Sequence, residues 1–302
     1  MKKAIYIIIV VVATAIAWSL SSCTERIDID TGENESAVVV YGTLADAPTY
    51  QTIVIRSTKN YFDPDYHGDY LSGVEVKVYT ASGKVYPMVE YPNVTGFYTS
   101  EERMSVEPGE LLLEMTIDKE TLPSSNGYYL ISETVPQPVK LDSIKIEASK
   151  LMGIEIYNLY IYAQDPPGED NYYFFSTTVR DSEGAITYSS GAITSYVLLD
   201  DSGFDGEYLD HHHVTTFISG KYSNGNSSGS GTIYVSPGDE VTFQMSSISE
   251  GYYRFLSECQ DAKNGTNPFF GGPPSNIYSN IPGGAGYFTG YCPTSAVTTV
   301  PE

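Results

Sequence analysis

The chain has 302 residues, with 16 lysines and arginines against 38 aspartates and glutamates, and its formal net charge is −22. Such an acidic chain repels nucleic acid and anionic membrane surfaces, so a DNA- or RNA-binding function is excluded. The 27 tyrosines, against 11 phenylalanines and 1 tryptophan, are typical of β-sheets with one exposed face.

Residues 1–22 have the pattern of an export signal. Lys2 and Lys3 precede an apolar run from Ala4 to Ala17, and small residues follow that run. A membrane-spanning anchor is the alternative, because the uncharged residues 4–22 approach the length of about 20 needed to cross a bilayer. The polar and small residues 18–22 favour a cleaved signal.

The segment Leu20-Ser21-Ser22-Cys23 resembles the lipobox of bacterial lipoproteins. That resemblance implies a diacylglyceryl cysteine at Cys23, cleavage before Cys23, and acylation of the new amino group with a fatty acid such as palmitate. Two or more acyl chains anchor a protein stably, at about 0.8 kcal/mol per buried CH₂. We therefore expect this covalent lipid, no other cofactor, and attachment to a membrane.

Residues 23–36 are polar and acidic and predict a short tether. About seven short strands at roughly ten-residue spacing follow, which predicts a β-sandwich over residues 37–138. Apolar side chains alternate along two of these strands and should face one core; they are Ile53 and Ile55 in the first, and Val74, Val76 and Val78 in the second.

A second, β-rich domain is predicted over residues 139–302. Extended segments are expected at residues 141–149, 154–165, 171–181, 192–200, 214–220, 232–236 and 239–245. The glycine- and proline-rich tail from Asn267 leaves little room for regular structure before Gly286. The glycines of Gly283-Gly284-Ala285-Gly286 predict positive φ angles or close backbone packing, because no helix follows that could bind phosphate.

One helix is predicted near residues 248–262. Ser247 and Glu250 have the spacing of a capping box. Apolar residues recur every three to four positions after them, and this stripe should pack on a sheet; its members are Tyr252, Phe255, Leu256 and Cys259.

Several segments together resemble one family of Bacteroidota outer-membrane lipoproteins, catalogued as domain of unknown function 4249. After Cys23 and its tether, they read VVVYGTL, SGVEVKVYTASGK, GFYTS, TVPQPVKLDSI, QDPPGEDNYYFF, DDSGFDGEYL, SISEGYYRFL and NPF…SNIYSNIPGGAGYFTGY. The resemblance covers nearly the whole chain after the signal. It implies an immunoglobulin-like, carboxypeptidase-regulatory-like sandwich, a cell-envelope location and frequent genetic association with TonB-dependent transporters. It implies no reaction and no catalytic residues.

Three motifs suggest chemistry without the context that the chemistry needs. The first is Gly225-Asn226-Ser227-Ser228-Gly229, which fits a hydrolase nucleophile pattern but lies in a serine- and glycine-rich loop before a predicted strand. The second is His211-His212-His213, where His211 and His213 would share a strand face and Asp205 or Asp210 could complete a metal site. An exposed strand edge explains the same histidines, and we predict no metal.

The third motif, Asp201-Ser202-Gly203-Phe204-Asp205, resembles part of a calcium loop, but position three is glycine and position twelve is His212. A turn rich in Asx residues explains the same letters, although a calcium site of another type is also consistent with them. Cys259 and Cys292 are the two cysteines not assigned to lipid. They form either a disulfide or two buried free thiols.

These observations lead to three hypotheses about function. The first is a non-catalytic, surface-exposed lipoprotein that serves as an accessory or ligand-capture subunit of a TonB-dependent transporter. The second is a glycan- or peptide-binding or adhesion module that acts alone through tyrosine-rich surfaces, namely Tyr157, Tyr160, Tyr162, Tyr172 and Tyr173. The third is a metal-dependent hydrolase built on His211 and His213.

Overall fold

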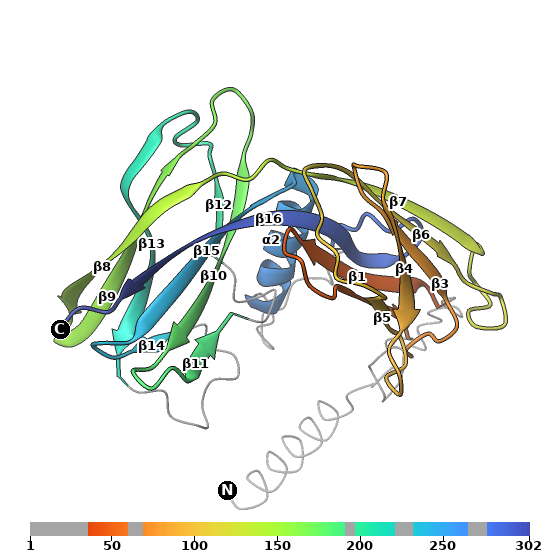
Figure 1. Ribbon diagram of the computed structural model, residues 1–302, viewed down its shortest axis with the longest axis horizontal. Helices are drawn as coiled ribbons and strands as arrows, with labels where there is room; N and C mark the ends of the chain where they lie inside the picture. Colours follow the sequence, from red (N-terminus) through yellow and green to blue (C-terminus); the bar gives the residue numbers. More distant parts are fainter. Residues whose placement is uncertain (1–35, 60–68, 191–196, 221–231, 265–276) are drawn as a thin grey trace, which may run out of the picture. The chain divides into compact units, whose positions relative to one another are not determined.

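A computed structural model describes residues 36–59, 69–190, 197–220, 232–264 and 277–302. These residues are mainly strand, and α2 (Glu250–Asn264) is the one helix among them (Figure 1). The expected mainly β fold, a sandwich followed by a β-rich part with a single helix, is confirmed. No helix within the described residues has the length and apolar character needed to cross a membrane.

Seven strands precede residue 138, as the spacing predicts. They are β1 (Val38–Ala45), β2 (Thr52–Ser57), β3 (Glu75–Tyr79), β4 (Val85–Glu90), β5 (Phe97–Ser100), β6 (Gly109–Thr116) and β7 (Tyr128–Val135). They are ordered β1-β2-β5-β4-β3-β6-β7 within one sheet. The predicted alternation holds, because Ile53, Ile55 and Val78 are fully buried in the core that these strands share.

Nine strands follow. They are β8 (Leu141–Leu151), β9 (Ile154–Gln164), β10 (Tyr172–Arg180), β11 (Ile186–Ser189), β12 (Val197–Asp200), β13 (Tyr208–Ser219), β14 (Tyr234–Val235), β15 (Glu240–Ile248) and β16 (Ala285–Thr299). Four of them form a separate sheet in the order β14-β13-β9-β8. A second core joins this sheet to β10 and β15, with Leu159 and Phe217 on one side and Phe175 and Phe243 on the other.

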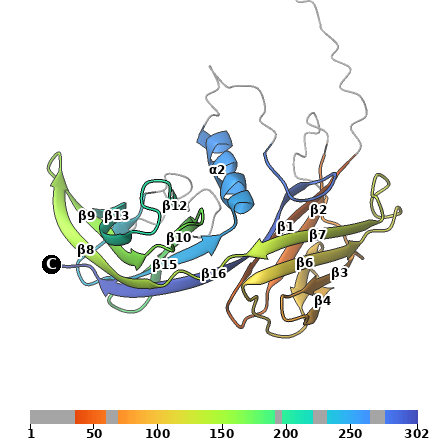
Figure 2. The same ribbon diagram turned by 90° about the horizontal axis from the view of Figure 1, so that it is seen from above.

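The helix α2 packs on the opposite face of β10. Successive side chains of a strand point to opposite faces, so Phe175 enters the second core while Phe174 contacts the helix. Phe174 lies in a third core with Tyr252 and Leu256 of α2, both at most 2% exposed. The predicted packing of the helix stripe on a sheet is therefore observed (Figure 2).

The last strand, β16, belongs to both parts of the chain. Its residues 285–291 pair in parallel with β1, and residues 292–299 pair antiparallel with β15. The strand runs unbroken through both regions (Figures 1 and 2). The expected division into residues 37–138 and 139–302 is therefore incomplete, because a C-terminal segment completes the N-terminal sheet.

Close packing of β16 on β1 requires glycine. Gly286 has a φ of 86°, and a Cβ atom there would collide with the carbonyl oxygen of Val40. Gly284 approaches the carbonyl oxygen of Val38 in the same way. The prediction that the 283–286 glycines serve positive φ angles or close packing is confirmed.

The start of α2 differs from the prediction. The helix begins at Glu250, and the Ser249 hydroxyl accepts a hydrogen bond from the Tyr252 N–H at 3.2 Å. Ser247 lies inside β15, and its hydroxyl accepts the Val139 N–H at 3.1 Å instead. The capping box of Ser247 and Glu250 is therefore wrong, because the ladder of β15 continues to Ile248 and delays the helix.

Candidate functional site

The predicted lipidation residue lies outside the described residues. The structure does not describe residues 1–35, which include the signal, Cys23 and the tether except Ser36. It does not describe Gly225-Asn226-Ser227-Ser228-Gly229 either. Lipidation of Cys23 therefore stays a prediction. The structure does place the other residues that the sequence analysis selected.

The histidines lie on an exposed part of β13. The ring of His211 stacks on Tyr160 of β9 with centroids 3.8 Å apart, and its Nε2 is 3.2 Å from Glu147 Oε1. His213 Nε2 is 3.0 Å from Thr216 Oγ1. Among the described residues, the one group of His, Cys, Asp and Glu ligand atoms close enough to hold a metal is that of Asp165, Asp201 and Asp205, so His211 and His213 do not form a metal site with Asp205 or Asp210. The two histidines belong to an aromatic and polar patch on the sheet.

The two thiols are not bonded to each other. Cys292 is 1% exposed inside the first core, whereas Cys259 is half-buried beside the core under α2. Of the two alternatives for these cysteines, the structure has free thiols. Burial raises the pKa of Cys259 and raises that of Cys292 to about 11, which keeps both protonated and unreactive at neutral pH.

Three carboxylates gather where two loops meet. Oxygen atoms of Asp165, Asp201 and Asp205 lie within 4.8 Å of one another, although Asp165 is 1% exposed and Asp201 is 4% exposed. Asp201 and Asp205 come from the segment that resembles a calcium loop. Asp165 directly follows the last residue of β9. The sequence analysis did not select it, because Asp201 and Asp205 lie some 40 residues further along the chain.

Each member of this aspartate cluster already bonds to the chain. Asp165 accepts the Tyr173 hydroxyl at 2.6 Å and the Gly206 N–H at 3.0 Å. Asp201 accepts both the backbone and the side-chain N–H of Asn171, at 2.9 and 3.2 Å. Asp205 Oδ1 accepts the Gly168 N–H at 2.7 Å. The cluster thus ties the turn between β9 and β10 to the loop of residues 201–207.

Burial raises the pKa of Asp165, and the charges of Asp201 and Asp205 raise it further, while its two hydrogen bonds act in the opposite direction. The pKa of Tyr173 is also raised, by burial and by the bond to Asp165. Carboxylate oxygens are the ligands of hard cations such as Ca²⁺. Of the carboxylate oxygens in the cluster, Asp201 Oδ1 and Asp205 Oδ2 make no hydrogen bond to other described residues. The other oxygens bond to the chain, and through these bonds the cluster holds two loops together.

A cleft of about 630 Å³ lies beside the turn that the cluster holds. One wall is the end of β7 and the chain that leads from it towards β8; together they span residues 134–139 and are called the linker. A second wall is the turn of residues 166–172, and the third is the junction of β15 and α2 at residues 247–250. The volume is within the range of small-molecule sites.

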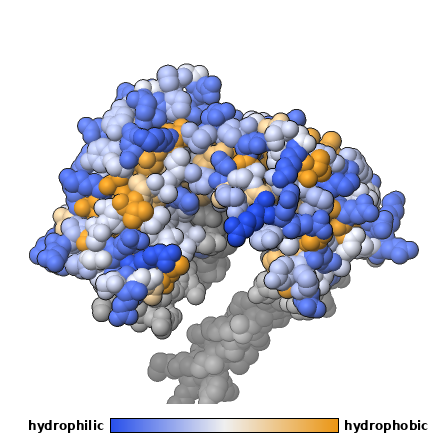
Figure 3. All heavy atoms as spheres, in the orientation of Figure 1, coloured by the Kyte–Doolittle hydropathy of each residue, from blue (hydrophilic) through white to orange (hydrophobic). Residues whose placement is uncertain are grey.

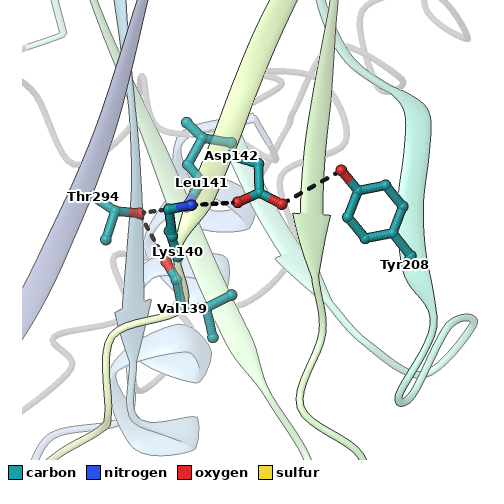
Figure 4. Close-up of polar contacts among 6 residues, drawn as sticks. All are labelled: Val139, Lys140, Leu141, Asp142, Tyr208 and Thr294. Carbon is teal, nitrogen blue, oxygen red and sulfur yellow. Dashed lines mark hydrogen bonds and ion pairs between the residues drawn. The ribbon is translucent and has the colours of Figure 1, made fainter.

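The linker wall is fixed by side chains from two other strands. Thr294 of β16 donates to the Val139 carbonyl at 2.8 Å and accepts the Leu141 N–H at 3.1 Å (Figure 4). Ser247 of β15 accepts the Val139 N–H. Beyond the linker, Asp142 joins Lys140 to the Tyr208 hydroxyl (Figure 4). The linker therefore enters β8 in one defined position.

The charged side chains of the cleft are all acidic. Glu169, Asp170 and Glu250 line it, and its described lining contains no lysine, arginine or histidine. Tyr172 lines it too, and its ring packs against that of Tyr253 with centroids 5.0 Å apart. The sequence analysis names Tyr172 for a tyrosine-rich surface but not the acidic residues beside it, because residues 169–172 and residue 250 meet only through the pairing of β10 with β15.

The sequence matches the family described as "Domain of unknown function (DUF4249)" over residues 24–296. The chain belongs to this family. The match covers both sheets, α2 and nearly all of β16, so the cleft and the aspartate cluster lie within the family domain. No curated protein matches the sequence.

Three solved structures show distant similarity to the chain. A tetra-tandem repeat from the extending region of a large adhesion protein has 11% identity and a TM-score of 0.21, covering 88% of this chain and 49% of the other. Salmonella alpha-2-macroglobulin has 13% identity and a TM-score of 0.23, with 72% and 14% covered. A DUF4785 family protein from Legionella pneumophila has 10% identity and a TM-score of 0.22, with 70% and 51% covered. The chain thus spans about half or less of each of these proteins.

Proposed function

We propose that this protein is a lipid-anchored, surface-exposed outer-membrane protein that serves as a non-catalytic accessory or ligand-capture subunit of a TonB-dependent transporter. The observation that carries the proposal is Leu20-Ser21-Ser22-Cys23 directly after a basic start and an apolar run. The family match begins at residue 24, directly after the proposed attachment site.

Further features of the charge, the surface and the cleft support a folded domain that is held at the membrane by its lipid and is exposed to solvent. The net charge of −22 keeps an anchored domain soluble and away from anionic lipid. On the face seen in Figure 3, hydrophilic side chains predominate and hydrophobic ones form small separate groups. The cleft between the linker and α2 gives such a domain a place to hold a small ligand.

Fractionation of cells tests the anchor, and crosslinking tests the partner. The full chain should incorporate labelled palmitate, sediment with the outer membrane and be cut by protease added to intact cells. Cys23→Ser should lose the label and leave the membrane fraction. Crosslinking followed by mild detergent extraction should recover a TonB-dependent transporter. A membrane-bound Cys23→Ser variant would contradict the anchor, and the absence of any transporter would contradict the partnership.

A stand-alone glycan-binding role is a second candidate, supported by the patch around Tyr160. Tyr160 and Tyr162 are half-exposed beside His211 on the outer face of the four-stranded sheet. Tyr157 and Tyr173 cannot contribute, because they are 4% and 0% exposed. Binding to a glycan array that is lost in Tyr160→Ala, without recovery of a transporter, would favour this role.

A further inference from the structure

We propose that the cleft between the linker of residues 134–139 and the start of α2 binds a ligand that carries a positively charged organic group, an ammonium or a guanidinium. This inference rests on the proposed ligand-capture function and names the class of ligand. The same charged group can belong to a free amine or to a basic side chain of a peptide, and the test below separates these sources.

The cleft has the size and stability of a binding site. Its volume of about 630 Å³ accommodates a small organic molecule or a few peptide residues. Two of its three walls are held by buried or half-buried hydrogen bonds. Asp201 holds the turn at Asn171, and Ser247 and Thr294 hold the linker at Val139. A site with fixed walls loses little conformational freedom when a ligand enters.

The charge of the lining selects a cation. Glu169, Asp170 and Glu250 are exposed, and their carboxylates form no hydrogen bond or ion pair with another described residue. Asp200 is not a lining residue of the cleft, but it pairs with Tyr172 across β10 and β12. Its carboxylate accepts the Tyr253 hydroxyl at 3.0 Å. Several negative charges around one concave surface attract a positive ligand and repel an anionic one.

Tyr172 adds a surface that suits an organic cation. The residue is half-buried and lines the cleft, and its hydroxyl forms no hydrogen bond with the rest of the described chain. Burial raises the pKa of Tyr172, and the nearby charges of Glu250 and Asp170 raise it further, so the carboxylates act directly on this phenol. An aromatic face attracts ammonium and guanidinium groups, and a neutral hydroxyl can accept their N–H bonds.

Helix stability explains only part of this arrangement. Glu250 occupies the first turn of α2, where a negative side chain is favourable without any ligand. Glu169 and Asp170 have no such role, because they follow Pro166-Pro167-Gly168 in a turn. The Glu169 carbonyl accepts the Asn171 side-chain N–H at 2.8 Å, a bond that helps to fix the turn without using either carboxylate.

Isothermal titration calorimetry of the full-length lipoprotein in detergent tests the proposal. The probes are spermidine and the tripeptide Gly-Lys-Gly, and Gly-Glu-Gly is the anionic control; both peptides are N-acetylated and C-amidated, so that the lysine side chain carries the only ammonium group of the two peptides. We expect saturable binding of at least one cationic probe and none of Gly-Glu-Gly, with an affinity that falls as salt rises. Binding of spermidine alone indicates a free amine, and binding of Gly-Lys-Gly alone indicates a peptide.

Two matched variants separate the cleft from the overall charge. The first combines Glu169→Gln, Asp170→Asn and Glu250→Gln, and should bind the cationic probe at least tenfold more weakly. The second combines Glu75→Gln, Asp118→Asn and Glu120→Gln, which lie at the far end of β3, β6 and β7, and should bind within twofold of the natural chain.

No binding of either cationic probe, or an equal loss in both variants, would overturn the proposal. The palmitate and crosslinking experiments on Cys23 do not depend on these titrations. A failure of the cleft is therefore distinguishable from a failure of the anchor or of the transporter partnership.

Discussion

The turn between β9 and β10 carries two groups of carboxylates that differ in what surrounds them. Asp165, on its buried side, bonds to Tyr173 and Gly206 and lies beside Asp201 and Asp205. Glu169 and Asp170, on its exposed side, bond to no described residue through their carboxylates. Acidic residues of one short segment therefore have two different roles: Asp165 stabilises the fold, and Glu169 and Asp170 line a cleft. Their hydrogen bonds distinguish the two roles, whereas their positions in the sequence do not.

The largest effect should come from removing the carboxylate of Asp165. Asp165→Ala leaves the buried Tyr173 hydroxyl and the half-buried Gly206 N–H without this acceptor, and an unsatisfied buried group costs about 1–3 kcal/mol. Relief of repulsion from Asp201 and Asp205 offsets part of this loss. We expect urea unfolding to show a fall of about 2–4 kcal/mol. A fall below about 0.5 kcal/mol would show that the cluster does not hold the loops.

A smaller loss should follow from Tyr173→Phe. The variant keeps the buried ring and removes one hydroxyl that donates to Asp165 at 2.6 Å. We expect the free energy of unfolding to fall by about 1–2 kcal/mol, since a hydrogen bond to a charged group is stronger than a neutral one. Tyr253→Phe, which removes the bond to the more exposed Asp200, is the matched control and should cost less.

The pH dependence of stability should distinguish Asp165 from the other carboxylates. Its folded pKa is raised, so it contributes stability that is present below its ordinary pKa of 3.8 and is lost as the pH rises through the folded value. Glu258 acts in the opposite sense, because Arg254 lowers its pKa. Asp165→Asn does not titrate. Its deficit in unfolding free energy relative to the natural chain should therefore grow as the pH falls from 7 towards 4, and a constant deficit would contradict the raised pKa.

The smallest effect on stability is expected for Tyr172→Phe. The ring contact with Tyr253 is kept, and the lost hydroxyl has no partner among the described residues. The free energy of unfolding should change by less than about 0.5 kcal/mol. Binding of the cationic probe should weaken severalfold, measured by the same titration. A large loss of stability would mean that this hydroxyl is structural.

The sequence predicts those elements whose pattern is local. Ile53 and Ile55 alternate because one face of β2 is buried, and the apolar stripe of Phe255 and Leu256 repeats because α2 lies on a sheet. The strand β16 escapes prediction, since residues 286–290 are buried in succession and show no alternation. Its pairing with β1 joins residues about 250 positions apart, and no local pattern records that contact.

The site is less predictable than the fold for the same reason. Asp201 and Asp205 suggest a cation loop by spacing, but their third companion, Asp165, comes from another segment. The spacing of Ser247 and Glu250 suggests a cap, yet Ser247 belongs to β15 and holds the linker. In each case the contacts of the side chain are made with residues far away in the sequence, so the neighbouring residues do not predict them.

The division between the two groups of carboxylates is tested most directly by urea unfolding of two variants side by side. One is Asp165→Asn, and the other combines Glu169→Gln, Asp170→Asn and Glu250→Gln. We predict that the single substitution lowers the free energy of unfolding more than the triple one, whose cost should stay near the 0.3–1 kcal/mol expected for Glu250 at a helix start. A triple variant that is less stable than Asp165→Asn would contradict the account, because the cleft carboxylates would then hold the fold themselves.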